Sequence, residues 1–113
     1  MPYVYEVSFD LDPKRLDELE IGQSLERVIG YLKIRLPVER GFVRAHAVYS
    51  VDDPEKSRVV LRSEWSDWSD VRDHRNSALV EDRVLEEFEH LTPEQITIRT
   101  YAEVGSGPYS VRR

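Results

Sequence analysis

The feature that most constrains the fold is a pair of alternating runs at residues 42–65, "FVRAHAVYSV" and "RVVLRSEW", separated by "DDPEKS". Apolar and polar side chains alternate in both runs, which is typical of strands that bury one face. The separating residues favour a tight turn. Residues 43–65 are therefore predicted to form an antiparallel β-hairpin. Its predicted apolar rows are Val43, Ala45, Ala47, Tyr49 and Val51 on one strand and Val59, Leu61, Ser63 and Trp65 on the other.

Two more alternating runs predict a strand near each end of the chain. They are "YVYEVSFDLD" at residues 3–12 and "ITIRTYAEV" at residues 96–104. Each run again carries an apolar row on one face and a polar row on the other. Together with the hairpin, these runs provide four strands for one sheet.

Helical spacing of apolar residues fills the intervals between these strands. A helix is expected to follow Ser24, its predicted N-cap, and to end before Pro37. The stretch before it, residues 14–23, is interrupted by Gly22 and is expected to be only a short helical lead-in. After the hairpin, two helical pieces are predicted at residues 66–76 and 77–91, with Trp68 on the inner side of the first piece and Ser77 as the cap of the second.

The resulting order, β-α-β-β-α-β, predicts an α+β, ferredoxin-like fold. In this fold a four-stranded antiparallel sheet carries its helices on one face. A chain of 113 residues is long enough for one domain. The domain is expected to cover residues 1–105, and residues 106–113 are expected to be a flexible tail.

Composition excludes several function classes. The formal net charge is −6 and no basic cluster is present, which argues against nucleic acid and anionic membranes as partners. There is no cysteine, and the three histidines lack the spacing of a metal site, so neither a metal nor another cofactor is expected. The first residues carry no basic, apolar leader, and a cytoplasmic protein is expected.

The polar rows of the predicted strands share the sheet face that the helices leave open. Charges of both signs alternate there with valine and tyrosine. This pattern fits a dimer interface with paired charges as well as it fits a solvated surface. The candidate interface residues are Glu6, Arg44, His46, Arg62, Glu64 and Arg99.

Large aromatic side chains and one imidazole cluster where the hairpin gives way to a helix, in "SEWSDWSDVRDHRNS" at residues 63–77. His74 is the candidate catalytic residue because imidazole can exchange a proton near neutral pH. The alternative is a histidine that only satisfies backbone carbonyls at a helix end. The candidate pocket-lining residues, which could equally be core, are Tyr3, Tyr5, Trp65, Trp68 and Phe88. Ala45 and Ala47 leave room either for a ligand or for the tyrosines.

From Gly41 to Ser77 the sequence resembles the antibiotic biosynthesis monooxygenase family of dimeric α/β barrels. The resemblance rests on the Gly-Phe entry into the second strand, the "DDP" turn, the Glu-Trp end of the third strand and the short helix that ends near His74. The stretches "LDPK" and "TIRTYAEV" also fit. This resemblance implies a homodimer in which two sheets face each other, with any pocket between helices and sheet.

The resemblance also implies an activity, the cofactor-independent oxygenation of a small aromatic or polyketide-like molecule. A second branch of the family degrades haem, but Val7, His74 and Val84 stand where that branch has its Asn, Trp and His. Haem degradation is therefore not expected. Two alternatives remain: a non-catalytic, ligand-binding or stress-associated dimer on the same scaffold, and an interaction module that uses the C-terminal tail.

Overall fold

The computed structural model describes residues 2–12, 14 and 17–105, so the predicted tail at residues 106–113 lies outside the described residues. The strands are β1 (Tyr3–Leu11), β2 (Phe42–Tyr49), β3 (Ser57–Trp65) and β4 (Thr97–Ala102). The helices are α1 (Glu18–Arg35), α2 (Trp68–Ser77) and α3 (Leu79–Glu87), with short 3₁₀ turns at Leu36–Val38 and Pro93–Gln95.

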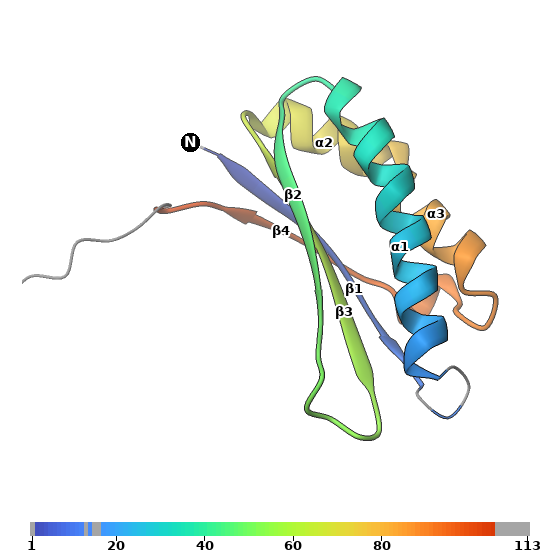
Figure 1. Ribbon diagram of the computed structural model, residues 1–113. Coiled ribbons are helices and arrows are strands. Elements are labelled where there is room, and N and C mark those ends of the chain that lie inside the picture. The colour runs from blue at the N-terminus through green and yellow to red at the C-terminus, as the bar shows by residue number, and fades with distance from the viewer. Residues whose placement is uncertain (1, 13, 15–16, 106–113) are drawn as a thin grey trace, which may run out of the picture.

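The strands form one antiparallel sheet in the order β2-β3-β1-β4, and all the helices pack on one of its faces (Figure 1). This arrangement confirms the predicted α+β, ferredoxin-like fold. The central strand β1 is hydrogen-bonded on both sides, whereas β2 and β4 are edges. In Figure 1 the helices lie to the right of the sheet, with α1 nearest the viewer and α2 and α3 behind α1.

The core lies between the helices and the sheet. It is built from the apolar rows of β1 and β3 and from one face of each helix. Val7, Val28, Val59, Trp65 and Val84 are completely excluded from solvent. On α1, the buried residues Ile21, Leu25, Val28 and Leu32 recur every three or four positions, as expected for a helix with one apolar face.

The predicted start of α1 is wrong. The helix begins at Glu18, and the Asp17 carboxylate caps it by accepting a hydrogen bond from the Glu20 backbone N–H at 2.8 Å. Ser24 therefore lies within the helix. Burial of Ile21 on the apolar face offsets the cost of Gly22, which is about 0.5–1 kcal/mol relative to alanine.

Three further side chains are oriented differently from the prediction. A β-bulge between Phe42 and Arg44 turns Phe42, rather than Val43, toward the helices. Val51 lies beyond the end of β2 in the turn and is exposed. Trp68 is the first residue of α2 and is 45 % exposed, because α2 begins there instead of at Ser66 and buries its next turn, including Val71.

The junction before β2 depends on a glycine in contact with α2. Gly41 has a φ of +80°, a left-handed conformation that favours glycine. A Cβ atom at Gly41 would overlap the buried side chain of Asp70. By contrast, a Cβ atom at Gly22 in α1 would meet no neighbour within 4 Å.

Gly41→Ala is therefore expected to lower the free energy of unfolding by about 2–4 kcal/mol, through backbone strain and overlap. The control Gly22→Ala should raise it by about 0.5–1 kcal/mol, because alanine favours the helix. Urea denaturation of both variants measures these changes. Equal stability of the two variants would contradict this description of the junction.

Candidate functional site

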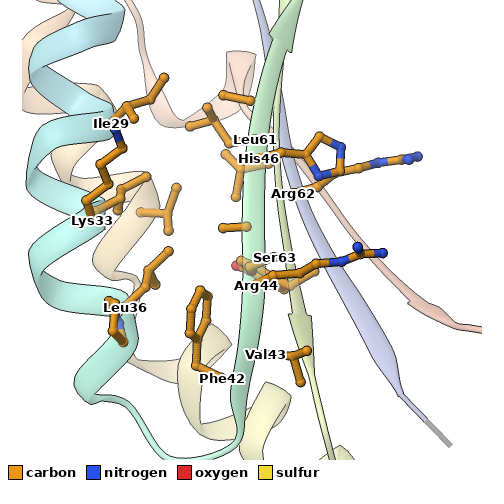
Figure 2. Close-up of a pocket in the computed structure, with 17 residues that line it drawn as sticks. Ile29, Lys33, Leu36, Phe42, Val43, Arg44, His46, Leu61, Arg62 and Ser63 are labelled. Carbon is orange, nitrogen blue, oxygen red and sulfur yellow. The ribbon is translucent and has the colours of Figure 1, made fainter. Parts of the chain in front are cut away.

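A cavity of about 380 Å³ lies between α1 and the β2–β3 side of the sheet (Figure 2). Its wall is mainly apolar. Ile29, Leu32 and Leu36 contribute from α1, and Leu61 contributes from β3. Tyr5 from β1 and Ser63 from β3 also line the cavity.

The cavity exists because three positions beneath α1 carry small side chains. Ala45 and Ala47 lie on the helix-facing row of β2, and Ser63 lies directly opposite Ala45 on β3. On β1, by contrast, the helix-facing row carries large side chains that are buried from Tyr5 to Leu11. Figure 2 shows the resulting space between α1 and β2. A volume of this size falls within the range of small-molecule sites.

Tyr5 extends from the central strand to this wall. The residue is buried, and its hydroxyl lies near the Glu81 carboxyl on α3 without a hydrogen bond of normal geometry to it. Burial, and then the negative charge of Glu81 on α3, raise the pKa of Tyr5. Burial also raises the pKa of the Glu81 carboxyl. A tyrosine in this setting stays protonated at neutral pH.

His74 lies directly behind Tyr5. It is 2 % exposed, its ring stacks on Trp65 at 4.4 Å, and it meets the Tyr5 ring edge-on at 5.0 Å. Nδ1 lies 3.1 Å from a carboxylate oxygen of Glu39. Burial lowers the pKa of His74, and Glu39 opposes this shift only in part.

His74 is therefore neutral at pH 7, and the carboxylate of Glu39 favours the tautomer with its proton on Nδ1. This tautomer leaves Nε2 as a hydrogen-bond acceptor. Nε2 is buried and has no partner among the described residues. His74 itself is not part of the cavity wall, because Tyr5 stands between the two.

The predicted pocket residues fall into two groups. Tyr5 lines the cavity, whereas the other four do not. Trp65 is core beneath His74, and Phe88 packs against Phe9. Tyr3 and Trp68 meet edge-on at 5.6 Å, and Arg75 lies over the Trp68 ring.

The cavity wall that α1 provides was missed in the sequence, as were Glu39 and Glu81. The helical pattern of α1 identifies a buried face but cannot show that part of this face borders empty space. Glu39 lies in a loop and Glu81 lies on the helix after that of His74, so nothing in the local pattern links either residue to the cavity.

The six predicted interface residues do share the outer face of the sheet. Arg62 donates to Glu6 at 3.0 Å, and Arg44 pairs with Glu64. The Tyr101 hydroxyl also donates to Glu6, at 3.2 Å. By register, His46 lies opposite Arg62, and Arg99 lies opposite Glu6. The charges on this face are thus largely paired within one chain.

Two searches of the described part of the chain were negative. Residues 2–12, 14 and 17–105 contain no group of three or more His, Asp or Glu placed to hold a metal ion. Within the same ranges, no helix has the length and hydropathy needed to cross a membrane.

Comparison with known proteins gives similarity in structure alone. No family model matches the chain, and no curated protein matches it. Among solved structures, the "Putative antibiotic biosynthesis monooxygenase from Nitrosomonas europaea" is 17 % identical, with a TM-score of 0.63 over 91 % of this chain and 90 % of that chain. This chain has the fold of that protein.

Two other structures with this fold differ in chemistry. A mutant of SnoaB, a cofactor-independent oxygenase from Streptomyces nogalater, is 15 % identical, with a TM-score of 0.61 over 96 % of this chain and 98 % of that chain. A hydroxynitrile lyase from Passiflora edulis is also 15 % identical, with a TM-score of 0.58 over 94 % and 97 %. The fold therefore does not determine the reaction.

Glu39→Gln should lower the pKa of His74 further, because it removes the charge that opposes the burial effect. When folding lowers the pKa of a histidine, the group contributes stability at pH values above its unfolded-state pKa, which is near 6.5. This contribution is lost as the pH falls from that value through the folded-state pKa. NMR titration of the His74 imidazole protons in the variant and the wild-type protein measures the change. An unchanged His74 titration in the variant would contradict the pairing.

Proposed function

We propose that the protein binds a small aromatic molecule in the cavity and oxygenates it with O₂, without a metal or flavin. The observation that carries this proposal is the mainly apolar cavity beneath α1, whose wall includes the side chains of Tyr5 and Ser63. Such a site fits a flat, mainly apolar ligand with one oxygen to be positioned. The shared fold with a cofactor-independent oxygenase supports the choice of reaction.

In this proposal, Tyr5 positions the oxygen of the substrate and His74 takes up its acidic C–H proton. Because Tyr5 separates His74 from the cavity and its hydroxyl is not hydrogen-bonded to His74 Nε2, an ordered water has to carry the proton from the substrate to Nε2. Glu39 holds the imidazole so that Nε2 is free to accept. The substrate carbanion then reduces O₂ and forms a C–O bond, and loss of water from the hydroperoxide leaves a carbonyl group. The apolar wall keeps bulk water away from the carbanion.

The position of His74 favours one alternative, a protein that binds the aromatic molecule without turnover. His74 does not touch the cavity, so binding can be complete while proton transfer is absent. The two functions share a ligand class and differ only in chemistry. Oxygen consumption therefore distinguishes them, whereas affinity does not.

The protein is further proposed to act as a homodimer whose protomers meet through the outer face of the sheet. On this face Val48 of β2 is 53 % exposed and Tyr101 of the opposite edge strand, β4, is 39 % exposed, whereas Glu6 and Ser8 on β1 between them are buried. Ion pairs formed within each chain reduce the cost of burying this surface against a second copy. The family resemblance points to the same face.

Filling the cavity should abolish binding. In Ala47→Phe, the new ring occupies the space beneath α1, and the affinity for 2-naphthol should fall by more than about tenfold. The control Ala102→Phe makes the same change on exposed β4, away from the cavity, and should leave the affinity unchanged. Fluorescence titration measures both affinities.

The same proteins test the reaction when anthrone replaces 2-naphthol. Oxygen uptake and anthraquinone formation are expected with the wild-type protein and with Ala102→Phe, but not with Ala47→Phe. If the wild-type protein binds 2-naphthol but takes up no oxygen with anthrone, the oxygenase proposal is excluded and ligand binding without turnover is supported. Undiminished binding by Ala47→Phe would contradict the cavity as the ligand site.

A charge on the outer face should separate the protomers. Val48→Glu places an unpaired carboxylate in the proposed interface and should produce a monomer in sedimentation equilibrium. Val51→Glu, in the exposed turn, is the matched control and should remain dimeric. A wild-type monomer would contradict the dimer directly.

A further inference from the structure

The cavity wall lacks negative charge in an acidic protein. The chain carries 22 Asp and Glu residues against 16 Lys and Arg residues. Nevertheless, none of the 17 residues that line the cavity is Asp or Glu. The ionisable side chains among them, apart from Tyr5, are Lys33, Arg44, His46 and Arg62.

Lys33 is the basic residue that lies on the ligand side of the sheet. In Figure 2, Arg44, His46 and Arg62 extend from the strands away from α1, toward the outer face. Arg44 and Arg62 are also engaged there by Glu64 and Glu6. Lys33 comes from α1, and its side chain runs along the helix at the cavity wall.

Among the residues that the structure describes, no acidic side chain pairs with Lys33. On a helix, a lysine meets the residues three and four positions away, which here are Ile29, Gly30, Leu36 and Pro37. None of these side chains can accept a hydrogen bond. The two other basic residues of α1 do have partners. Arg27 pairs with Glu87, and Arg35 donates a hydrogen bond to the Tyr31 hydroxyl.

We propose that the cavity selects an aromatic carboxylate, with its ring between α1 and the sheet and its anionic group against the Lys33 ammonium. This inference rests on the proposed function and names the class of ligand within it. An anion that approaches a protein of net charge −6 is repelled overall, so selection requires a local cation at the site. The apolar remainder of the wall disfavours a second charge on the ligand.

An isosteric pair of probes isolates the charge. 2-Naphthoate and 2-naphthamide share a ring and a shape, and they differ in one negative charge. Isothermal titration at pH 7.5 should show naphthoate binding about tenfold more tightly than the amide, as a charge-assisted contact predicts. This preference should shrink as salt is added, because Lys33 is exposed.

Two lysine variants locate the selecting group. Lys33→Gln should lower the affinity for naphthoate to that of the amide and leave amide affinity unchanged. Lys56→Gln removes the same charge from the exposed hairpin turn, outside the cavity, and should keep the full preference. Thermal unfolding of both variants checks that the fold is retained.

The outcomes separate this inference from the proposed function. Equal affinity of the two probes for the wild-type protein, or a preference that survives Lys33→Gln, overturns anion selection while the aromatic site stands. If Lys33→Gln lowers only thermal stability, Lys33 serves the C-terminal end of α1 rather than a ligand. If neither probe binds at millimolar concentration, both the site and the selection fail.

Discussion

Burial of the central strand β1 is the interaction on which the rest of the structure depends. From Tyr5 to Phe9 every residue of this strand is buried, including Glu6 and Ser8 on the outer face. The helices pack where the side chains of β1 and β3 are large. The edge strand β2 carries alanines instead, so α1 cannot close against it. A tightly packed centre and a loosely filled edge thus belong to the same layer, and the cavity lies at their boundary.

Tyr5 belongs to both the packed centre and the cavity wall, and it connects the cavity with His74. Its ring completes the core against His74, while its side chain also forms part of the cavity wall. Buried polar atoms without partners are costly, by about 1–3 kcal/mol each, and are uncommon in folded proteins. The Tyr5 hydroxyl and His74 Nε2 are two such atoms in one cluster. A ligand or an ordered water that satisfies the Tyr5 hydroxyl would reduce this cost.

The fold was predictable because alternation and helical spacing report burial directly. The rows of β1 and β3 were predicted correctly on this basis, as was the clustering of charges on the outer face. The exact start of a helix was not predictable where two nearby residues could both cap it and tertiary packing decides between them. Asp17 and Ser24 are both good N-caps, and only the burial of Ile21 selects the earlier one.

The site was harder to predict than the fold. Periodicity shows which side chains face inward but not whether they meet one another. It therefore could not separate Tyr5, which borders the cavity, from Trp65, which is filled core. Glu39 reaches His74 from a loop 35 positions away, and only the folded chain brings the two together. His74 stood out in the sequence by its chemistry, but its place behind Tyr5 required the structure.

The measurement that tests this account most directly is a search for intermolecular nuclear Overhauser effects between 2-naphthol and methyl groups of the protein. The account predicts contacts from the naphthol ring protons to Ile29, Leu61 and Val80, which line the cavity from α1, β3 and α3. Contacts to Val48 and Val60 on the outer face, without any to these three residues, would contradict it. They would show that the exposed sheet, rather than the space beneath α1, binds the ligand.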